Sequence, residues 1–111
     1  MNGNEVFKFA VKTMGESAVR SIEKAGLTTE DISLLVPHQA NMRIIKSAAK
    51  RLGFPMDKVL VNIQHTGNTS AASIPLCLDE YKDRLHKGSK LLLTAFGAGF
   101  TWGAMYLVWD I

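Results

Sequence analysis

Near its C-terminus the chain contains nineteen consecutive residues without a charged side chain, residues 91–109. A run of this length is about what a helix needs to cross a lipid bilayer, so one interpretation is a membrane span. Three glycines interrupt the run, however, and the segments on either side of them, residues 91–94 and 104–109, are typical of strands. We therefore expect a β-hairpin with a glycine turn and no contact with a membrane.

The N-terminal residues have the hydrophobic period of a long helix with one buried face. Apolar side chains recur at spacings of three and four between Phe7 and Ala25. Asn4 is a suitable N-cap residue, and Gly26 is a suitable residue for the left-handed position that ends a helix. The pattern predicts a helix between Asn4 and Gly26.

Strand-like and helical patterns then alternate along the chain. Residues 32–36, which end at Pro37, and residues 59–63 are short apolar runs typical of buried strands. Helical periodicity covers residues 39–52 and residues 70–86, and a proline is tolerated in the first turns of a helix, as at position 75. Shorter turn signals lie between these segments, a capped turn at residues 28–31 and a glycine turn at residues 66–68.

This order of elements predicts an α/β fold with a mixed sheet. We expect three parallel strands, a final antiparallel strand and helices that cover the sheet. No internal repeat or linker-like composition divides the chain, so residues 1–111 are expected to form a single domain.

Charge and cysteine content exclude several classes of protein. Thirteen Lys and Arg against ten Asp and Glu give a net charge of +3, which is too small for a protein that coats nucleic acid. Cys77 is the single cysteine, and there is no Cys/His cluster for a metal, so we expect no metal site and a reducing, cytoplasmic environment. Cys77 lies beside two leucines in a predicted helix, and we interpret it as a small buried hydrophobic residue.

Polar or glycine-rich residues follow the predicted parallel strands. His38, Asn68 and the turn at residues 96–99 come after successive strands, whose carboxyl ends lie at one edge of such a sheet. Each also has an ordinary explanation as a turn or cap residue. Together they predict a site, because a neutral imidazole and a carboxamide both donate hydrogen bonds to an enolate oxygen, and backbone N–H groups can serve a second oxyanion.

Four ordered blocks of sequence resemble the type III β-ketoacyl-acyl-carrier-protein synthases, members of the thiolase superfamily. The blocks are GNEVF at residues 3–7, VPHQAN at 36–41, GNTSAASIP at 67–75 and AFGAGFTWG at 95–103. Family members are longer proteins built of two similar halves, and the chain resembles the C-terminal half. The resemblance therefore implies one half of a thiolase-like fold, with the N-terminal half absent.

The resemblance also implies a reaction. In the family, a cysteine takes an acyl group from acyl-CoA, malonyl-acyl carrier protein loses carbon dioxide, and the resulting carbanion attacks the acyl thioester. His38 and Asn68 match the catalytic histidine and asparagine, whereas the cysteine belongs to the absent half and Cys77 matches no catalytic position. We thus expect no cofactor beyond the two substrates, and no activity from this chain alone.

Other positions match family residues with supporting roles. The backbone N–H of Ala98, where many relatives have glycine, would form part of an oxyanion hole, and Phe96 would pack beside the nucleophile. Asn4, Ala40 and Asn41 would line the pantetheine channel. The residues expected to dock the acidic acyl carrier protein are Lys8, Arg43, Lys50 and Arg51. The whole enzyme is expected to be a homodimer.

Two alternatives remain open from the sequence. The chain could be a non-catalytic module that binds acyl carrier protein, or part of a related condensing enzyme with another acyl substrate. If a flanking half is missing, we also expect an unpaired strand edge, and either self-association or a weakly stable monomer.

Overall fold

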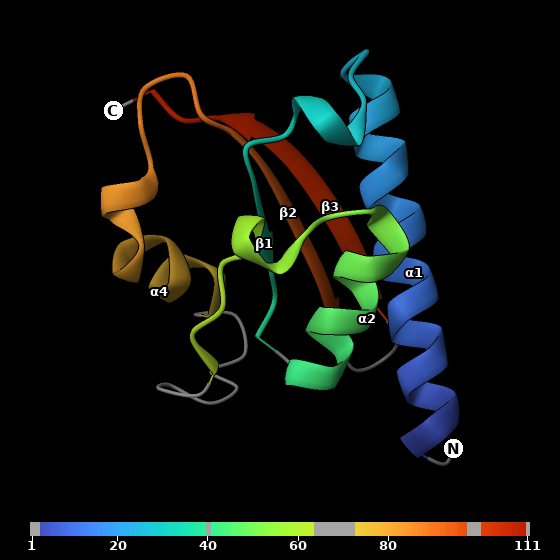
Figure 1. Cartoon of the computed structure of the whole chain (residues 1–111). Coiled ribbons are helices and arrows are strands. Elements are labelled where there is room, and N and C mark those ends of the chain that lie inside the picture. Colours follow the sequence, from blue (N-terminus) through green and yellow to red (C-terminus); the bar gives the residue numbers. More distant parts are fainter. Residues whose placement is uncertain (1–2, 40, 64–72, 98–100, 111) are drawn as a thin grey trace.

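The computed structural model describes residues 3–39, 41–63, 73–97 and 101–110. Figure 1 shows three layers, with α1 and α2 on one side of a sheet and α4 on the other. In chain order, the helices and strands are α1 (Gly3–Lys24), β1 (Leu34–Pro37), α2 (Met42–Leu52), α4 (Ser73–Glu80), β2 (Lys90–Gly97) and β3 (Thr101–Val108).

The sheet has the mixed pairing expected from the sequence. β1 is parallel to β2, and β2 is antiparallel to β3, in the spatial order β1-β2-β3. Side chains alternate between the faces of β1, so that Leu35 packs against α1 and α2 while Leu34 and Val36 pack on the α4 side. The antiparallel pairing of the predicted C-terminal hairpin is confirmed, whereas residues 98–100 of its turn lie outside the described residues. No helix in the described ranges is long and apolar enough to span a membrane.

Helix α1 confirms the predicted helix with a different first residue. Its buried face carries Ala10, Met14, Ala18 and Ile22, at helical spacing. The helix begins at Gly3, so Asn4 lies inside the first turn and is not the N-cap. The buried apolar stripe, which begins at Ala10, stabilises the body of the helix.

The C-terminal end of α1 is a Schellman motif. Gly26 has a φ of 72°, its N–H donates to the Glu23 carbonyl oxygen at 3.0 Å, and the Leu27 N–H donates to the Ile22 carbonyl oxygen at 3.1 Å. The predicted turn after it is also present, because the Asp31 carboxylate accepts the Thr28 N–H at 2.8 Å.

Residues 59–63 form less of a strand than the sequence predicts. They contribute one parallel bridge, between Leu35 and Val59, in the place of the third parallel strand. Beyond it, side chains satisfy the backbone. The Tyr81 hydroxyl donates to the Val61 carbonyl oxygen at 2.5 Å, and the Gln39 side chain accepts the N–H groups of the following two residues. A β-branched run does not extend into a strand when its backbone groups already have other partners.

The other two helices are shorter than expected. The N-cap of α2 is Asn41, whose side-chain oxygen accepts the Ile44 N–H at 2.8 Å, so the helix does not begin at Gln39. α4 ends at Glu80 and is followed by a 3₁₀ turn. As predicted, Pro75 lies in the first turn of α4, where its missing N–H costs little.

Candidate functional site

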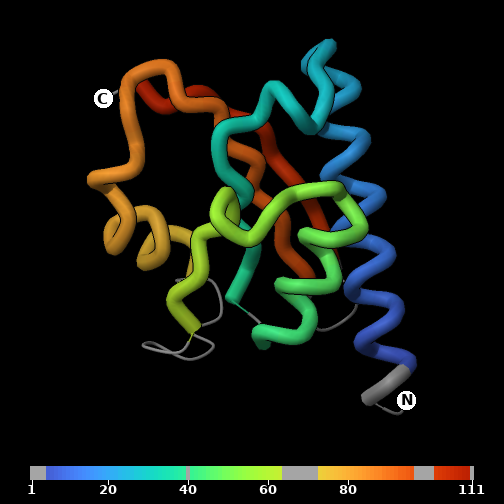
Figure 2. Tube along the Cα trace, in the orientation of Figure 1, coloured from blue at the N-terminus to red at the C-terminus, as the bar shows by residue number. Residues whose placement is uncertain are grey.

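The carboxyl ends of β1 and β2 lie at the same edge of the sheet. Pro37 pairs with Thr94, and the His38 N–H donates to the Thr94 carbonyl oxygen at 2.7 Å. Phe96 lies two residues further along β2. The starts of α1, α2 and α4 lie at this end of the molecule, the lower end in Figure 2. The structure thus brings His38 and Phe96 to one edge, as the sequence predicts.

His38 is held by contacts to two elements. Its backbone N–H bonds to β2, and its ring Nδ1 lies 2.6 Å from the Oγ of Ser73, the first residue of α4. The side chain is half-buried, and burial lowers the pKa of the imidazole below its usual range. At neutral pH the ring is therefore uncharged and carries one N–H donor.

Gln39, the next residue, is fully buried and uses its whole side-chain amide. Its Nε2 donates to the carbonyl oxygens of Pro37 at 2.9 Å and Leu60 at 3.2 Å. Its Oε1 accepts the N–H groups of Asn62 at 2.9 Å and Ile63 at 3.1 Å. The amide therefore fastens the residues just before His38 to the segment at residues 60–63.

Sequence analysis missed the contributions of Gln39, Ser73 and Thr94. Thr94 is buried, and its hydroxyl donates to the Met14 carbonyl oxygen at 3.3 Å, which connects β2 to α1. The sequence offers one signal for such contacts, the polar side chain of Gln39 next to His38, in a segment expected to be helical. Apart from Pro37, the partners of this side chain lie more than twenty residues away, so the sequence does not reveal them.

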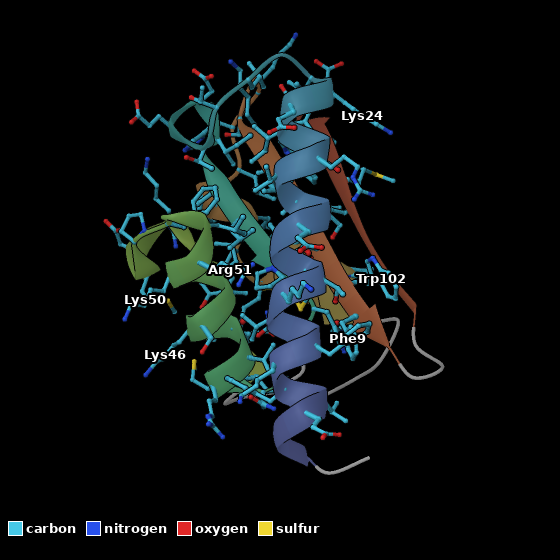
Figure 3. The ribbon with its side chains drawn as sticks, turned by 90° about the vertical axis from the view of Figure 1, so that its right-hand side faces the viewer. Phe9, Lys24, Lys46, Lys50, Arg51 and Trp102 are labelled. Carbon is cyan, nitrogen blue, oxygen red and sulfur yellow. The ribbon has the colours of Figure 1, made fainter. Side chains whose placement is uncertain are left out.

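Aromatic side chains form an apolar wall next to this edge. The ring of Phe9 lies edge-on to Phe96, with centroids 6.0 Å apart, and edge-on to Trp102, with centroids 5.5 Å apart. Figure 3 shows Phe9 on α1 and Trp102 on β3 pointing toward each other. Trp102 remains 48% exposed.

The basic residues predicted to dock a partner are exposed. The Arg43 guanidinium lies 4.2 Å from the centroid of the Phe7 ring, a cation–π contact. Figure 3 shows Lys46 and Lys50 on the side of α2 that points away from α1, whereas Arg51 lies on the side next to α1, near Gly15. One ion pair is found within the described ranges, between Lys87 and Asp110. It involves no residue of α2, so it does not neutralise the basic side chains of that helix. The exposed set is Lys8, Arg43, Lys46, Lys50 and Arg51.

Cys77 behaves as a buried hydrophobic residue, as the sequence predicts. It is fully buried in the core below α4, and burial, followed by the Glu80 charge, raises the pKa of its thiol to about 12. A thiol with this pKa is not a nucleophile at neutral pH. In the part of the chain that the structure describes, no group of His, Cys, Asp and Glu side chains could hold a metal ion.

Several predicted site residues are not placed by the structure. Asn68, Ala40 and Ala98 lie outside the described residues, and the side chain of Asn4 does as well. Asn41 is exposed, and its side chain serves as the N-cap of α2.

Comparison with known proteins identifies similar sequences over nearly the whole chain. The profile described as 3-oxoacyl-[acyl-carrier-protein (ACP)] synthase III C terminal matches residues 22–109. A β-ketoacyl-[acyl-carrier-protein] synthase III of Bacteroides thetaiotaomicron is 56% identical over 107 residues, which are 96% of this chain and 32% of the relative. The chain spans about a third of the length of the curated relatives it matches.

Solved structures of such proteins also match. The synthase III of Thermus thermophilus has a TM-score of 0.94 and 57% identity, over 99% of this chain and 35% of that one. The synthase III of Pseudomonas aeruginosa has a TM-score of 0.95 and 43% identity, over 100% of this chain and 36% of that one. The predicted α/β fold, one part of a thiolase-like structure, is therefore confirmed.

Proposed function

This chain belongs to the 3-oxoacyl-[acyl-carrier-protein] synthase III family, and on that basis we propose that it provides the enolate-stabilising part of a decarboxylating condensing enzyme. The remaining part of the enzyme would provide the cysteine that carries the acyl group. Cys77 cannot replace it, because its thiol is buried with a pKa of about 12. The chain alone is therefore inactive in this proposal.

The proposed reaction joins two acyl groups. The cysteine thiol of the other part attacks the carbonyl carbon of acyl-CoA, the C–S bond to CoA breaks, and CoA leaves as its thiol, so that the acyl group is held on the cysteine as a thioester. Malonyl-acyl carrier protein then loses carbon dioxide, and the electron pair of the broken C–C bond passes into the thioester as an enolate. The enolate carbon attacks the acyl thioester carbonyl, and the cysteine thiolate leaves, which gives 3-oxoacyl-acyl carrier protein. No further cofactor takes part.

His38 and Asn68 would donate hydrogen bonds to the malonyl thioester oxygen as it becomes negative. The observation that carries this proposal is the neutral imidazole at the sheet edge, with Nδ1 held by Ser73 at 2.6 Å. A neutral donor can strengthen its bond to the oxygen as charge develops. Removal of one donor of this kind from an enzyme costs about 100-fold to 1,000-fold in rate.

The other predicted positions have supporting roles in the proposal. Phe96, braced by Phe9, would form an apolar wall beside the reacting thioester, from which water is excluded. The backbone N–H of Ala98 would contribute to the oxyanion hole for acyl transfer. Asn4, Ala40 and Asn41 would line the pantetheine channel.

The exposed cations are proposed to dock the acyl carrier protein, which is acidic. Lys8, Arg43, Lys50 and Arg51 have positions expected from the family, and Lys46 lies between them on α2. Such contacts mainly accelerate encounter and weaken with salt. We further propose that the whole enzyme is a cytoplasmic homodimer.

The test uses a hybrid in which this chain replaces the matching third of the Thermus thermophilus relative. His38→Ala and Asn68→Ala should each lower decarboxylation of a malonyl thioester by about 100-fold or more. Acylation of the cysteine should persist, since that step uses other donors. His86→Ala, at an exposed histidine, is the matched control. Decarboxylation that continues unchanged in both variants would contradict the proposal.

A second candidate function is a non-catalytic module that binds acyl carrier protein. The exposed charges of α2 favour it, because they are available without any other part of an enzyme. Titration of the isolated chain with acyl carrier protein separates the two functions. A dedicated module should bind with a Kd on the order of micromolar, whereas an enzyme part should bind more weakly.

A further inference from the structure

The hydroxyl of Ser73 has two neighbours at hydrogen-bond distance. One is Nδ1 of His38, at 2.6 Å, and the other is the backbone N–H of Gln39, at 3.4 Å. Ser73 is 2% exposed, so water does not readily replace either partner. Where the hydroxyl proton goes therefore decides the protonation pattern of the imidazole.

The donor and acceptor inventory assigns that proton. A hydroxyl has one proton to donate and oxygen lone pairs that accept, whereas a backbone N–H can only donate. The Gln39 N–H therefore bonds to a lone pair of the Ser73 oxygen. Among the residues that the structure describes, the acceptor left for the hydroxyl proton is His38 Nδ1. A nitrogen that accepts carries no proton, so the neutral ring has its proton on Nε2.

We propose that Ser73 is a positioning residue that holds His38 as its Nε2–H tautomer. This inference concerns the ring itself, and its consequence for catalysis rests on the proposed function. In the Nε2–H form, Nε2, the ring nitrogen that does not bond to Ser73, can donate its proton in a hydrogen bond to a substrate oxygen. In the other tautomer that nitrogen would present a lone pair and repel a developing enolate.

Different elements of the fold hold Ser73 and His38 in place. Ser73 begins α4, and Cys77, one turn later, is fully buried against the sheet. His38 is bound through its N–H to Thr94 of β2. The two residues are 35 positions apart in sequence, and their contact joins α4 to the end of β1.

The tautomer of a catalytic histidine can have a large effect on rate. In serine proteases, a substitution that leaves the catalytic histidine in the wrong tautomer lowers kcat by about 10⁴-fold.

Histidine tautomers can be measured directly by long-range ¹H–¹⁵N NMR spectra of the imidazole rings. The spectra are recorded on the full 111-residue chain and on the hybrid, which contains the complementary part of the fold. The chain has three histidines, and the signals lost in His38→Gln identify the ring of interest. We expect the Nε2–H pattern for His38 in both samples.

Two variants test the role of the hydroxyl. Ser73→Ala should shift the tautomer ratio toward Nδ1–H by about fivefold to tenfold, the factor equivalent to one hydrogen bond. Ser73→Thr keeps a hydroxyl and should restore the ratio, whereas a purely structural role would leave the ratio unchanged in both variants. An Nδ1–H ring in the unsubstituted protein, or an unchanged ratio in Ser73→Ala, would overturn the proposal.

The outcome is independent of the proposed reaction. If His38→Ala leaves decarboxylation unchanged while the spectra show the Nε2–H ring, the function fails and the tautomer assignment stands. If His38→Ala abolishes decarboxylation and Ser73→Ala changes neither the tautomer ratio nor kcat, the function stands and the role of Ser73 fails.

Discussion

Two neighbouring regions of this protein use polar side chains in opposite ways. The buried polar cluster, His38, Gln39, Ser73 and Thr94, is neutral, half or fully enclosed, and connected by hydrogen bonds of defined geometry. The basic helix face, Arg43, Lys46, Lys50 and Arg51, begins four residues after Gln39 and is exposed to water.

The two regions differ in how strongly the free energy of the protein favours one arrangement of their side chains. A buried donor or acceptor that loses its partner costs about 1–3 kcal/mol, so the cluster has one strongly preferred arrangement. Exposed charges are screened and contribute about 0–1 kcal/mol each, so many arrangements of the basic helix face have similar energy. The cluster is thus suited to orienting a reacting atom, and the face to attracting a partner of opposite charge.

The largest effect is expected from Gln39→Leu, which keeps the volume of the side chain and removes its amide. Backbone groups at residues 37, 60, 62 and 63 would lose their partners. Because each such group costs about 1–3 kcal/mol, we expect the free energy of unfolding to fall by at least about 3 kcal/mol. Urea denaturation, with a shift of the midpoint at constant slope, measures it.

Gln39→Glu is the matched control for that substitution. It keeps the oxygen that accepts the Asn62 and Ile63 N–H groups and removes the donor to Pro37 and Leu60. Its stability should differ from that of Gln39→Leu. If both substitutions changed stability by less than about 0.5 kcal/mol, the range typical of exposed positions, the contrast between the two regions would be wrong.

The second-largest effect is expected in the dependence of the free energy of unfolding on pH. Burial lowers the pKa of His38 in the folded protein below that of the unfolded chain, so the unfolded state binds more protons between the two values. The contribution of His38 is complete above the unfolded value of about 6.5 and is lost as the pH falls toward the folded value.

Substitution of His38 by Gln should flatten this part of the stability curve, measured by urea unfolding at several pH values. His86→Gln, the same substitution at an exposed histidine, is the matched control for the chemistry of the change. A curve that keeps its slope in His38→Gln would show that the histidine is not the group that titrates.

Smaller effects are expected on the basic helix face. The double substitution Lys46→Gln with Lys50→Gln should leave the free energy of unfolding within about 0.5 kcal/mol, because both side chains are exposed. Binding of acyl carrier protein to the hybrid should weaken about threefold to tenfold at low salt, and the difference should shrink as salt is added.

Lys24→Gln provides the control for charge alone. Lys24 lies at the far end of α1, away from the side chains of α2 in Figure 3. Its substitution should change the affinity little. Equal losses in Lys24→Gln and in the α2 variant would mean that net charge, rather than this face, attracts the partner.

The smallest effect is expected from Gly15→Ala, which moves one charge of the face without removing it. A Cβ at Gly15 would lie 2.8 Å from Cδ of Arg51, so the flexible arginine side chain must shift. Ala favours helix by up to about 1 kcal/mol over Gly, and we expect stability to stay equal or rise slightly. A drop of more than about 1 kcal/mol in thermal or urea unfolding would show that Arg51 is rigidly held.

Elements with local signals were predictable from the sequence. α1 follows from an apolar stripe over many turns, and its end at Gly26 follows from a residue that tolerates a positive φ. The hairpin of β2 and β3 follows from two apolar runs around glycines. The sequence also indicates His38 as a candidate for chemistry, because its position after a strand places it at the sheet edge.

Elements that depend on distant partners were not predictable. Residues 59–63 have a strand pattern, yet the side chains of Gln39 and Tyr81 take up the backbone groups that would extend it. Asn41, rather than a residue near Gln39, caps the N-terminus of α2, because the side chain of Gln39 is hydrogen-bonded to the distant residue Leu60. No local signal carries this information.

The amino-acid sequence by itself determined the long helix, the hairpin, the mixed α/β class and the histidine at a strand end, because periodicity and glycine conformation act over a few neighbouring residues. Tertiary structure decided which nitrogen of His38 meets Ser73, and which backbone groups the Gln39 amide binds. The physical reason is that a buried hydrogen bond acts over about 3 Å in space between groups that can lie anywhere along the chain.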